Sequence, residues 1–391
     1  MKSSSIQALP RNRGRRAHGW WLVVMMLTAT ASVTHADATD DYVRTEMAKK
    51  RIPGLSVAVM RDGRVVKETA YGVASVELGA PVTLDTVYTL ASMTKVFTAS
   101  AIMLLVEEGQ ISLDEPVSKI LPQLPPAWSA VTVRHCLSHT SGLPDALIDN
   151  VNMSTIAPDR DTLLDNLAQR PVEPAGERSV YNQTGYILLA MIIEKLSGMS
   201  YEKFLQTRLL DPAGLSGARF GDSWAIIPNR ADLYTALDIT PDHLKIQVHD
   251  GQPILLHDRI LHYGSKNTPD YMAPAALLNG SIRDLVNWEK VLAGGKLLKP
   301  STLAEMMTPY RLRDGKSGDF GLGFVTLSLS PHATRYAAVS YGGGAATWRV
   351  SFPEKHLTVI VLTNLQDSQP ESIALGIAAL YEPSMGTTGA Q

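Results

Sequence analysis

Residues 91–109 have the sequence ASMTKVFTASAIMLLVEEG. Apolar residues occupy nearly every side of a helix over this stretch, which is typical of a helix buried in the middle of a domain. Gly109 follows the last apolar residues, and glycine is common just past the end of a helix. We therefore expect a central buried helix that begins at Ser92 and stops at Gly109.

Ser92 and Lys95 lie one turn apart at the start of this helix, on the same face. A serine hydroxyl attacks a carbonyl once a base takes its proton, and burial beside an apolar helix lowers the pKa of a lysine toward that task. The helix N-terminus also favours an oxyanion. Spacing alone leaves a structural role open, because Ser200 and Lys203 repeat it and Ser200 fits the N-cap of a helix over 201–209.

Short β-prone runs lie toward both ends of the chain. Residues 55–60 and 65–69 are joined through Asp62 and Gly63, and Asp-Gly favours the tight turn of a hairpin. A second hairpin and a final helix are predicted near the other end, from residues 348–352, 353–355, 356–362 and 371–381.

The middle of the chain is rich in proline and loop residues with helical stretches between them, at 161–169, 186–196 and 201–209. Two further helices, separated by Gly294 and Gly295, are expected within 281–307. Strands at both ends with helices between them predict an α+β fold, in which one antiparallel sheet is built from both termini, flanked by helices and interrupted by a mostly helical subdomain.

The predicted domain occupies residues 39–385. Its sheet part is expected at 39–110 and 275–385, and its helical insertion at 111–274. The cleft between these two parts is the expected place for a site.

The composition is that of a globular protein, with 45% hydrophobic and 19% charged residues among 391. A formal net charge of -2 supplies no basic field, so nucleic acid is not an expected partner. The single cysteine, Cys136, excludes an intrachain disulfide and is interpreted as a buried small hydrophobe. His135 and His139 have no third ligand at suitable spacing, so no metal site is predicted, and His139 is expected to hydrogen-bond within the loop over the site.

The N-terminus has the order of a secretory signal peptide. Basic residues precede an apolar run over 20–31, and the small residues Ala36 and Ala38 follow it. The apolar run is shorter than the ~20 residues that a membrane span needs. We expect residues 1–38 to be removed and the mature chain to be periplasmic or secreted, without a stable membrane span. Retention of the leader as an anchor is the alternative.

The stretch from Ile52 to Pro144 resembles the superfamily of serine β-lactamases, penicillin-binding proteins and β-lactamase-fold esterases, in which a strand pair leads to an S-x-x-K helix. Residues 137–143, LSHTSGL, resemble the L-x-H-T-S-G-L signature of that superfamily. The similarity extends to the closing strands and covers almost the whole mature chain. It implies that Ser92 is the nucleophile and Lys95 its general base.

Residues 181–186, YNQTGY, resemble the Y-x-N-T-G-Y run of the same superfamily. The resemblance implies that Tyr181 shuttles a proton between nucleophile and leaving group, with its pKa lowered by the charge of Lys95. Gln183 stands where asparagine is usual, and its longer amide would donate a hydrogen bond to a substrate carbonyl. A buried tyrosine at a helix entrance is the structural alternative for Tyr181.

Residues 340–344, SYGGG, match the place of the K-T-G or H-x-G strand. Glycine lets a strand approach substrate closely, here at Gly343, and the N–H of Gly344 would join that of Ser92 as the oxyanion hole. Tyr341 replaces a cation that helps to bind the carboxylate of β-lactams and D-alanyl peptides, which favours uncharged esters. A glycine-weakened strand or bulge is the structural alternative.

Together these residues predict a serine hydrolase that forms an acyl-enzyme and needs no metal or organic cofactor. The leading interpretation is a carboxylesterase acting on small acyl esters. Within the same class, the alternatives are a D-alanyl-D-alanine carboxypeptidase, a D-amino-acid amidase or a β-lactamase. A catalytically silent binding or sensor domain is the alternative from another class. The expected partner is a small ester, amide or peptide substrate.

Overall fold

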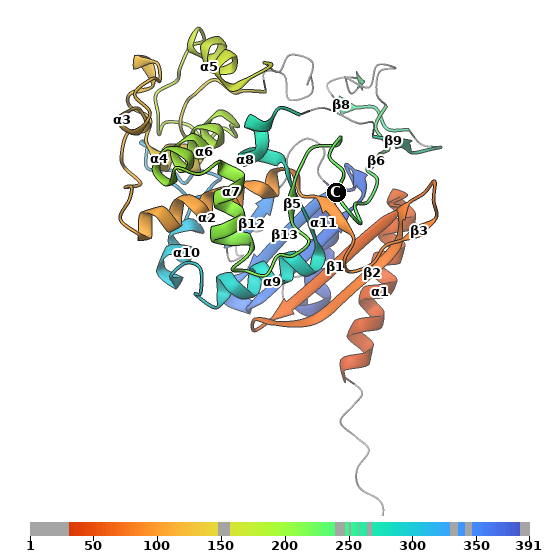
Figure 1. Cartoon of the computed structure of the whole chain (residues 1–391). Coiled ribbons are helices and arrows are strands. Elements are labelled where there is room, and N and C mark those ends of the chain that lie inside the picture. The colour runs from red at the N-terminus through yellow and green to blue at the C-terminus, as the bar shows by residue number, and fades with distance from the viewer. Residues whose placement is uncertain are drawn as a thin grey trace, which may run out of the picture.

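A seven-stranded antiparallel sheet forms the centre of the protein (Figure 1). The computed structural model describes residues 31–147, 157–238, 247–249, 252–256, 258–263, 268–328, 335–340 and 346–383. In sheet order, the strands are β11 (Val325–Ser328), β12 (Arg335–Ser340), β13 (Thr347–Phe352), β14 (Leu357–Thr363), β1 (Gly54–Arg61), β2 (Arg64–Ser75) and β3 (Ala80–Pro81). The two ends of the chain therefore meet in one sheet, which confirms the predicted α+β class.

The first hairpin has the tight turn that its sequence predicts. Arg61 pairs with Arg64, so Asp62 and Gly63 alone form the loop. Both have positive φ, 52° and 72°, as a two-residue turn of the I′ kind requires. β2 runs on to Ser75, well beyond the predicted end of the strand at residue 69.

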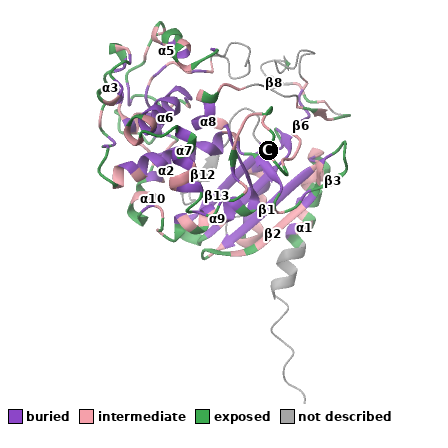
Figure 2. Ribbon diagram, in the orientation of Figure 1, coloured by how far each residue is buried: buried purple, intermediate pink, exposed green. Residues whose placement is uncertain are grey.

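The two faces of the sheet pack against different helices, because alternate residues of a strand point to opposite faces. On β1, Leu55, Val57 and Val59 join the core under α1 (Ala31–Lys50) and α11 (Pro370–Tyr381). Ala58 and Met60 join the larger core that contains α2 (Thr94–Glu107) and α9 (Ile282–Ala293). Figure 2 shows β1 and α2 as almost entirely buried.

Most of the remaining helices gather around α2, at one end of the sheet (Figure 1). The remaining helices are α3 (Val117–Ile120), α4 (Val133–Leu137), α5 (Arg160–Ala168), α6 (Thr184–Ser197), α7 (Tyr201–Leu205), α8 (Ala273–Ala276) and α10 (Pro300–Met306). The helix predicted over 201–209 is α7 followed by a single π turn, Gln206–Leu210. The helices predicted within 281–307 are α9 and α10.

Three small sheets complete the structure. One contains β4 (Val87–Thr89), β10 (Leu278–Ser281) and β5 (Arg219–Phe220). The others contain β15 (Leu365–Gln366), β6 (Tyr234–Thr235) and β9 (Leu261–His262), and β7 (Val248–His249) with β8 (Gln252–Pro253). Of these, the β4–β10–β5 sheet matters most for the site, because β4 leads directly to Ser92.

The central helix begins slightly later than predicted. Ala91–Met93 form a 3₁₀ turn, and α2 starts at Thr94. Short 3₁₀ turns are frequent where a helix begins. Among the described residues, no helix has the length and apolarity that a membrane span requires. Residues 1–30, which carry most of the predicted signal peptide, lie outside the described residues.

Candidate active site

Ser92 lies in the sharp turn between β4 and α2. The backbone N–H of Leu90 donates to the carbonyl oxygen of Leu278 on β10, at 3.0 Å. The hydroxyl of Thr94 donates to Ala91 O at 2.6 Å and accepts from Leu278 N at 3.1 Å. This turn is therefore fastened to β10 by both backbone and side chain.

The residue before Ser92 has a strained backbone. Ala91 has a φ of 47°, in the left-handed region that residues with a Cβ rarely adopt. Such strain persists where the surrounding structure holds the chain firmly, and it is concentrated at functional sites. Here the hydroxyl of Thr347, at the start of β13, adds a further hydrogen bond to Leu90 O at 3.3 Å.

Lys95 is the cation next to Ser92. Its Nζ lies 3.2 Å from Ser92 Oγ and donates to the carbonyl oxygen of Ala275, on α8, at 2.9 Å. Both Ser92 and Lys95 have 3% of their surface exposed. Burial lowers the pKa of Lys95 to about 7. A neutral amine in this place donates to Ala275 and presents its lone pair to the Ser92 hydroxyl.

The Tyr181 ring lies against the Lys95 amine. The Nζ of Lys95 is 4.7 Å from the centroid of the Tyr181 ring and 5.5 Å from that of Tyr186. The Tyr181 ring also packs against His139, with ring centroids 4.5 Å apart. The Lys95 amine therefore contacts both Ser92 and Tyr181, which the sequence placed in two distant motifs.

The LSHTSGL segment forms a frame for the segment that carries Tyr181. The side chain of Asn182 donates to Leu143 O at 2.9 Å and accepts from Gly185 N at 2.8 Å. The hydroxyl of Thr184 donates to Pro144 O at 2.7 Å. Asn182, which lies between the two motif residues Tyr181 and Gln183, thus holds the two segments together.

Gln183 is the N-cap residue of α6 and is 5% exposed. Its backbone N–H donates to the carboxylate of Asp145 at 2.9 Å. Its predicted contact between side-chain amide and substrate remains a prediction.

Asp145 is a site residue that sequence reasoning missed. Burial raises the pKa of this carboxyl, and its negative charge in turn raises the pKa of Lys95, against the stronger effect of burial. The available signal was an acidic residue directly after residues 137–144, LSHTSGLP. Ala275, by contrast, acts through its carbonyl oxygen, for which no side-chain signal exists.

The predicted third motif lies outside the described residues, which exclude Tyr341, Gly343 and Gly344. Its described neighbours are close to the turn that carries Ser92. β12 ends at Ser340, which pairs with Trp348 on β13, and the preceding Thr347 is the residue bonded to Leu90. The oxyanion-hole and substrate roles of the motif remain predictions.

Other candidates from the sequence have structural surroundings. Ser200 is the N-cap of α7 and accepts from Lys203 N at 3.3 Å, as predicted. Cys136 is buried, which raises the pKa of its thiol to about 12. His135 belongs to the capping box of α4. His139 hydrogen-bonds to the segment that carries Tyr181, since its Nδ1 accepts from Asn182 N at 3.1 Å.

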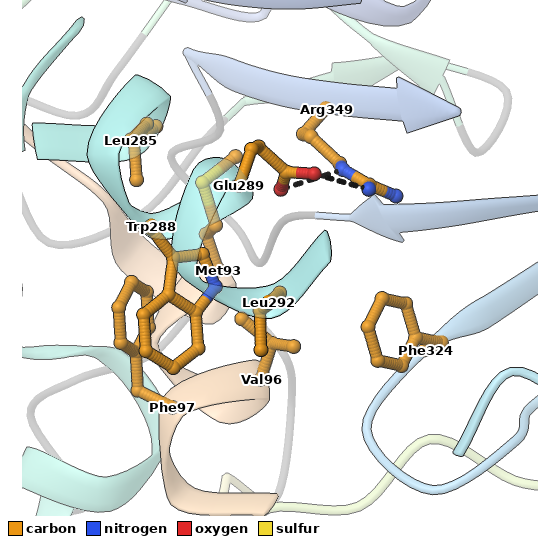
Figure 3. A pocket seen from close by; sticks show the side chains of 9 residues that line it. All are labelled: Met93, Val96, Phe97, Leu285, Trp288, Glu289, Leu292, Phe324 and Arg349. Carbon is orange, nitrogen blue, oxygen red and sulfur yellow. Dashed lines mark hydrogen bonds and ion pairs between the residues drawn. The ribbon is translucent and has the colours of Figure 1, made fainter. Parts of the chain in front are cut away.

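A small, mainly apolar pocket lies between α2, α9 and β13, and Met93, which follows Ser92, lines it (Figure 3). Its polar wall is a buried ion pair. Arg349 Nε lies 2.9 Å from Glu289 Oε1, and a second contact joins Nη2 to Oε2. The two side chains are 6% and 12% exposed. This pair connects α9 to β13, the strand that contacts the turn carrying Ser92.

Comparisons with known proteins identify the family and the fold of the chain. A family model described as Beta-lactamase matches residues 39–381. Penicillin-binding protein 4* of Bacillus subtilis (strain 168) is 30% identical over 320 residues, which are 80% of this chain and 68% of that protein.

Solved structures show the same fold. The octameric penicillin-binding protein homologue from Pyrococcus abyssi has a TM-score of 0.67 and 28% identity, covering 88% of this chain and 77% of that one. EstCE1, described as a hydrolase with promiscuous acyltransferase activity, has a TM-score of 0.72 and covers 90% of this chain and 99% of its own. At 22% identity, the likeness to EstCE1 is one of fold alone.

Proposed function

The chain belongs to the Beta-lactamase family of hydrolases, and on that premise we propose that it is a serine hydrolase that cleaves small acyl esters through an acyl-enzyme intermediate. The observation that carries this proposal is the Lys95 amine. It lies 3.2 Å from the Ser92 hydroxyl, and its pKa is about 7. A base with such a pKa is half deprotonated near neutral pH, where it removes a serine proton efficiently.

The first half of the reaction forms the acyl-enzyme. Lys95, with Tyr181, takes the proton of Ser92, and Ser92 Oγ bonds to the substrate carbonyl carbon. The carbonyl electrons move to oxygen, where the N–H groups of Ser92 and Gly344 would hold the negative charge. Tyr181 then delivers a proton to the leaving oxygen as the carbon–oxygen bond breaks.

The second half releases the acid. A water molecule gives its proton to the same base pair and attacks the acyl carbon, and Ser92 Oγ leaves and regains a proton. The catalyst returns to its starting protonation state.

The charges near the nucleophile support an uncharged substrate. Lys95 is largely neutral above pH 7, and Asp145 adds a nearby carboxylate. Tyr341 stands where related enzymes carry a cation for a substrate carboxylate. Among the described residues around Ser92, little positive charge is available to the carboxylate of a β-lactam or of a peptide with a free C-terminus. An ester without a carboxylate does not require such a charge.

Hydrolysis of 4-nitrophenyl acetate and butyrate by the purified residues 39–391 tests the proposal, with Ser92→Ala as the inactive variant and nitrocefin as a second substrate. We expect ester turnover that Ser92→Ala abolishes and little cleavage of nitrocefin. Ester turnover that survives Ser92→Ala would remove Ser92 from the mechanism. Covalent labelling of Ser92 without turnover would instead indicate a silent binding domain.

We also propose that residues 1–38 direct export and are removed. Expression of the full chain in a Gram-negative host, followed by fractionation and N-terminal sequencing, checks this. The expected product is periplasmic and begins near residue 37 or 39, whereas an intact N-terminus in the membrane fraction would indicate an anchor.

A further inference from the structure

We propose that His139 is a positioning residue for Tyr181, because it fixes the backbone on both sides of that tyrosine and supports the tyrosine ring. This inference rests on the proposed function, in which Tyr181 protonates the leaving group. It assigns a mechanical task to the histidine of the LSHTSGL segment, 42 positions earlier in the chain.

The backbone contacts come in a pair. The N–H of Val180 donates to the carbonyl oxygen of His139 at 2.9 Å. The N–H of Asn182 donates to Nδ1 of the same histidine at 3.1 Å. The amides immediately before and after Tyr181 are therefore both held by one residue, so the Cα of Tyr181 has little freedom to move.

The ring contacts act in the same direction. The His139 ring lies 4.5 Å from the Tyr181 ring, 5.1 Å from Tyr186 and 4.6 Å from Phe320, all measured between centroids. His139 is 4% exposed, so this cluster is packed rather than solvated. Contact between rings restricts the side-chain rotation that would carry the Tyr181 hydroxyl away from the leaving group.

An unusual backbone conformation makes the double contact with the 180–182 segment possible. His139 has a φ of 56°, in the left-handed region, where histidine is less rare than most residues that carry a Cβ. In this conformation both its carbonyl oxygen and its ring bond to the same neighbouring segment. A local strain of this kind is maintained where the surrounding structure uses it.

The imidazole is neutral in this arrangement. Nδ1 accepts a hydrogen bond, so it carries no proton, and the proton of the neutral ring is on Nε2. Burial, together with the nearby charge of Lys95, holds the pKa of His139 well below its usual range. The acceptor that holds Asn182 therefore persists throughout the pH range in which Lys95 titrates.

Two substitutions separate the ring from the acceptor. His139→Phe keeps an aromatic ring but loses the acceptor for Asn182 N–H. His139→Asn loses the ring but keeps a side-chain acceptor at a similar distance from the backbone, and asparagine tolerates positive φ. His135→Asn is the matched control, because His135 is a partly buried histidine four residues earlier that bonds to Thr132 and Tyr310.

The readout is the ratio of kcat/KM for two butyrate esters. 4-Nitrophenyl butyrate releases a stable phenolate that needs no proton, whereas ethyl butyrate releases an alkoxide that must be protonated. General-acid catalysis contributes on the order of 100-fold to 10,000-fold. We expect His139→Phe to lower kcat/KM for ethyl butyrate at least ~10-fold more than kcat/KM for 4-nitrophenyl butyrate. His139→Asn should lie closer to wild type, and His135→Asn should keep the wild-type ratio.

If His139 had a merely structural role, its substitution would lower kcat/KM for both esters by the same factor. An unchanged ratio in folded, active His139→Phe and His139→Asn would therefore overturn the positioning role and leave the proposed function intact. Absence of Ser92-dependent turnover in the wild type would overturn both. Circular dichroism checks folding, and His139→Leu, which also lacks an acceptor, replaces His139→Phe if the latter does not fold.

Adding Tyr181→Phe completes the test. If His139 acts through Tyr181, the double variant should have the same ester ratio as Tyr181→Phe alone. Additive effects on the ratio would contradict the proposal.

Discussion

The side-chain amine of Lys95 donates a hydrogen bond to the carbonyl oxygen of Ala275, 2.9 Å away and 180 positions later in the chain. This contact fixes the orientation of the amine, whose nitrogen also contacts Ser92 Oγ. It also compensates part of the loss of water around a fully buried lysine. The surroundings of the Lys95 amine therefore include a backbone group from α8, which is distant in the sequence.

The lysine in the first S-x-x-K pair should be essential, and the lysine in the second should not. Lys95→Arg replaces a titrating amine with a guanidinium that keeps its proton, so kcat should fall at least ~100-fold. Lys203→Arg, on the exposed surface of α7, should leave kcat unchanged. Hydrolysis of 4-nitrophenyl butyrate measures both. Comparable activity of Lys95→Arg and wild type would exclude Lys95 as the base.

Activity should rise with pH through about 7, because Lys95 must lose its proton to act as a base. Asp145→Asn should move this rise to lower pH, since the negative charge of Asp145 raises the pKa of Lys95. Asparagine still offers an oxygen to the N–H of Gln183. A kcat/KM profile from pH 5 to 9 measures the shift, with the surface variant Asp314→Asn as control. A shift to higher pH would contradict the assignment.

Replacing Lys95 should stabilise the fold, most of all at low pH. The folded-state pKa of about 7 lies below the ordinary 10.5, so the unfolded chain binds more protons between these values. Wild-type stability therefore rises with pH in that window, by at most about 1.4 kcal/mol per unit. The free energy of unfolding of Lys95→Met should exceed that of wild type, and the difference should shrink as pH increases from 7 to 9. Urea unfolding measures it. An advantage that grows with pH would refute this.

Thr94 should matter for stability and activity through its hydroxyl. Thr94→Val keeps the shape but leaves Leu278 N–H without its acceptor, whereas Ala91 O loses the hydroxyl and still accepts from the backbone N–H of residue 94. An unpaired buried polar group costs about 1–3 kcal/mol. Because the same contacts fasten the Ser92 turn, kcat should fall as well. Urea unfolding and ester hydrolysis measure the two effects. Thr94→Ser should recover most of both, and its failure to do so would point to the methyl group instead.

The ion pair between Glu289 and Arg349 should be far more sensitive to loss of one partner than to loss of both. Glu289→Gln leaves a buried guanidinium without its carboxylate, at a cost of about 3–5 kcal/mol. The double variant Glu289→Leu with Arg349→Met places two apolar side chains in an already apolar pocket, and it should recover much of the lost stability. Chemical denaturation of the three proteins measures it. Equal destabilisation by the single and double variants would argue against a buried pair.

The local elements were predictable because they depend on periodicity and turn chemistry. The Asp62-Gly63 turn, the helices on either side of Gly294 and Gly295, and the closing strands lie where their sequences indicate. These features involve residues close in the chain, whose geometry is limited by backbone sterics and by which side is buried. The central helix was predicted to within two residues of its start at Thr94.

The site was predicted in part. Ser92 and Lys95 share a helix turn, so their contact follows from spacing alone, whereas the approach of Tyr181 was inferred through family resemblance. Asp145 was missed, because an acidic residue in a loop is usually solvated and nothing local shows that it faces a buried lysine.

The sequence alone specified the β-hairpins, the buried helix and the serine–lysine pair, since each arises from neighbours along the chain or from an apolar pattern of fixed period. The partners of that pair depended on how distant segments pack. Ala275 meets Lys95 and His139 meets Tyr181 only after α8, α6 and the 137–145 loop have closed around α2. Those contacts are set by the shape and burial of the assembled core, and no local pattern records them.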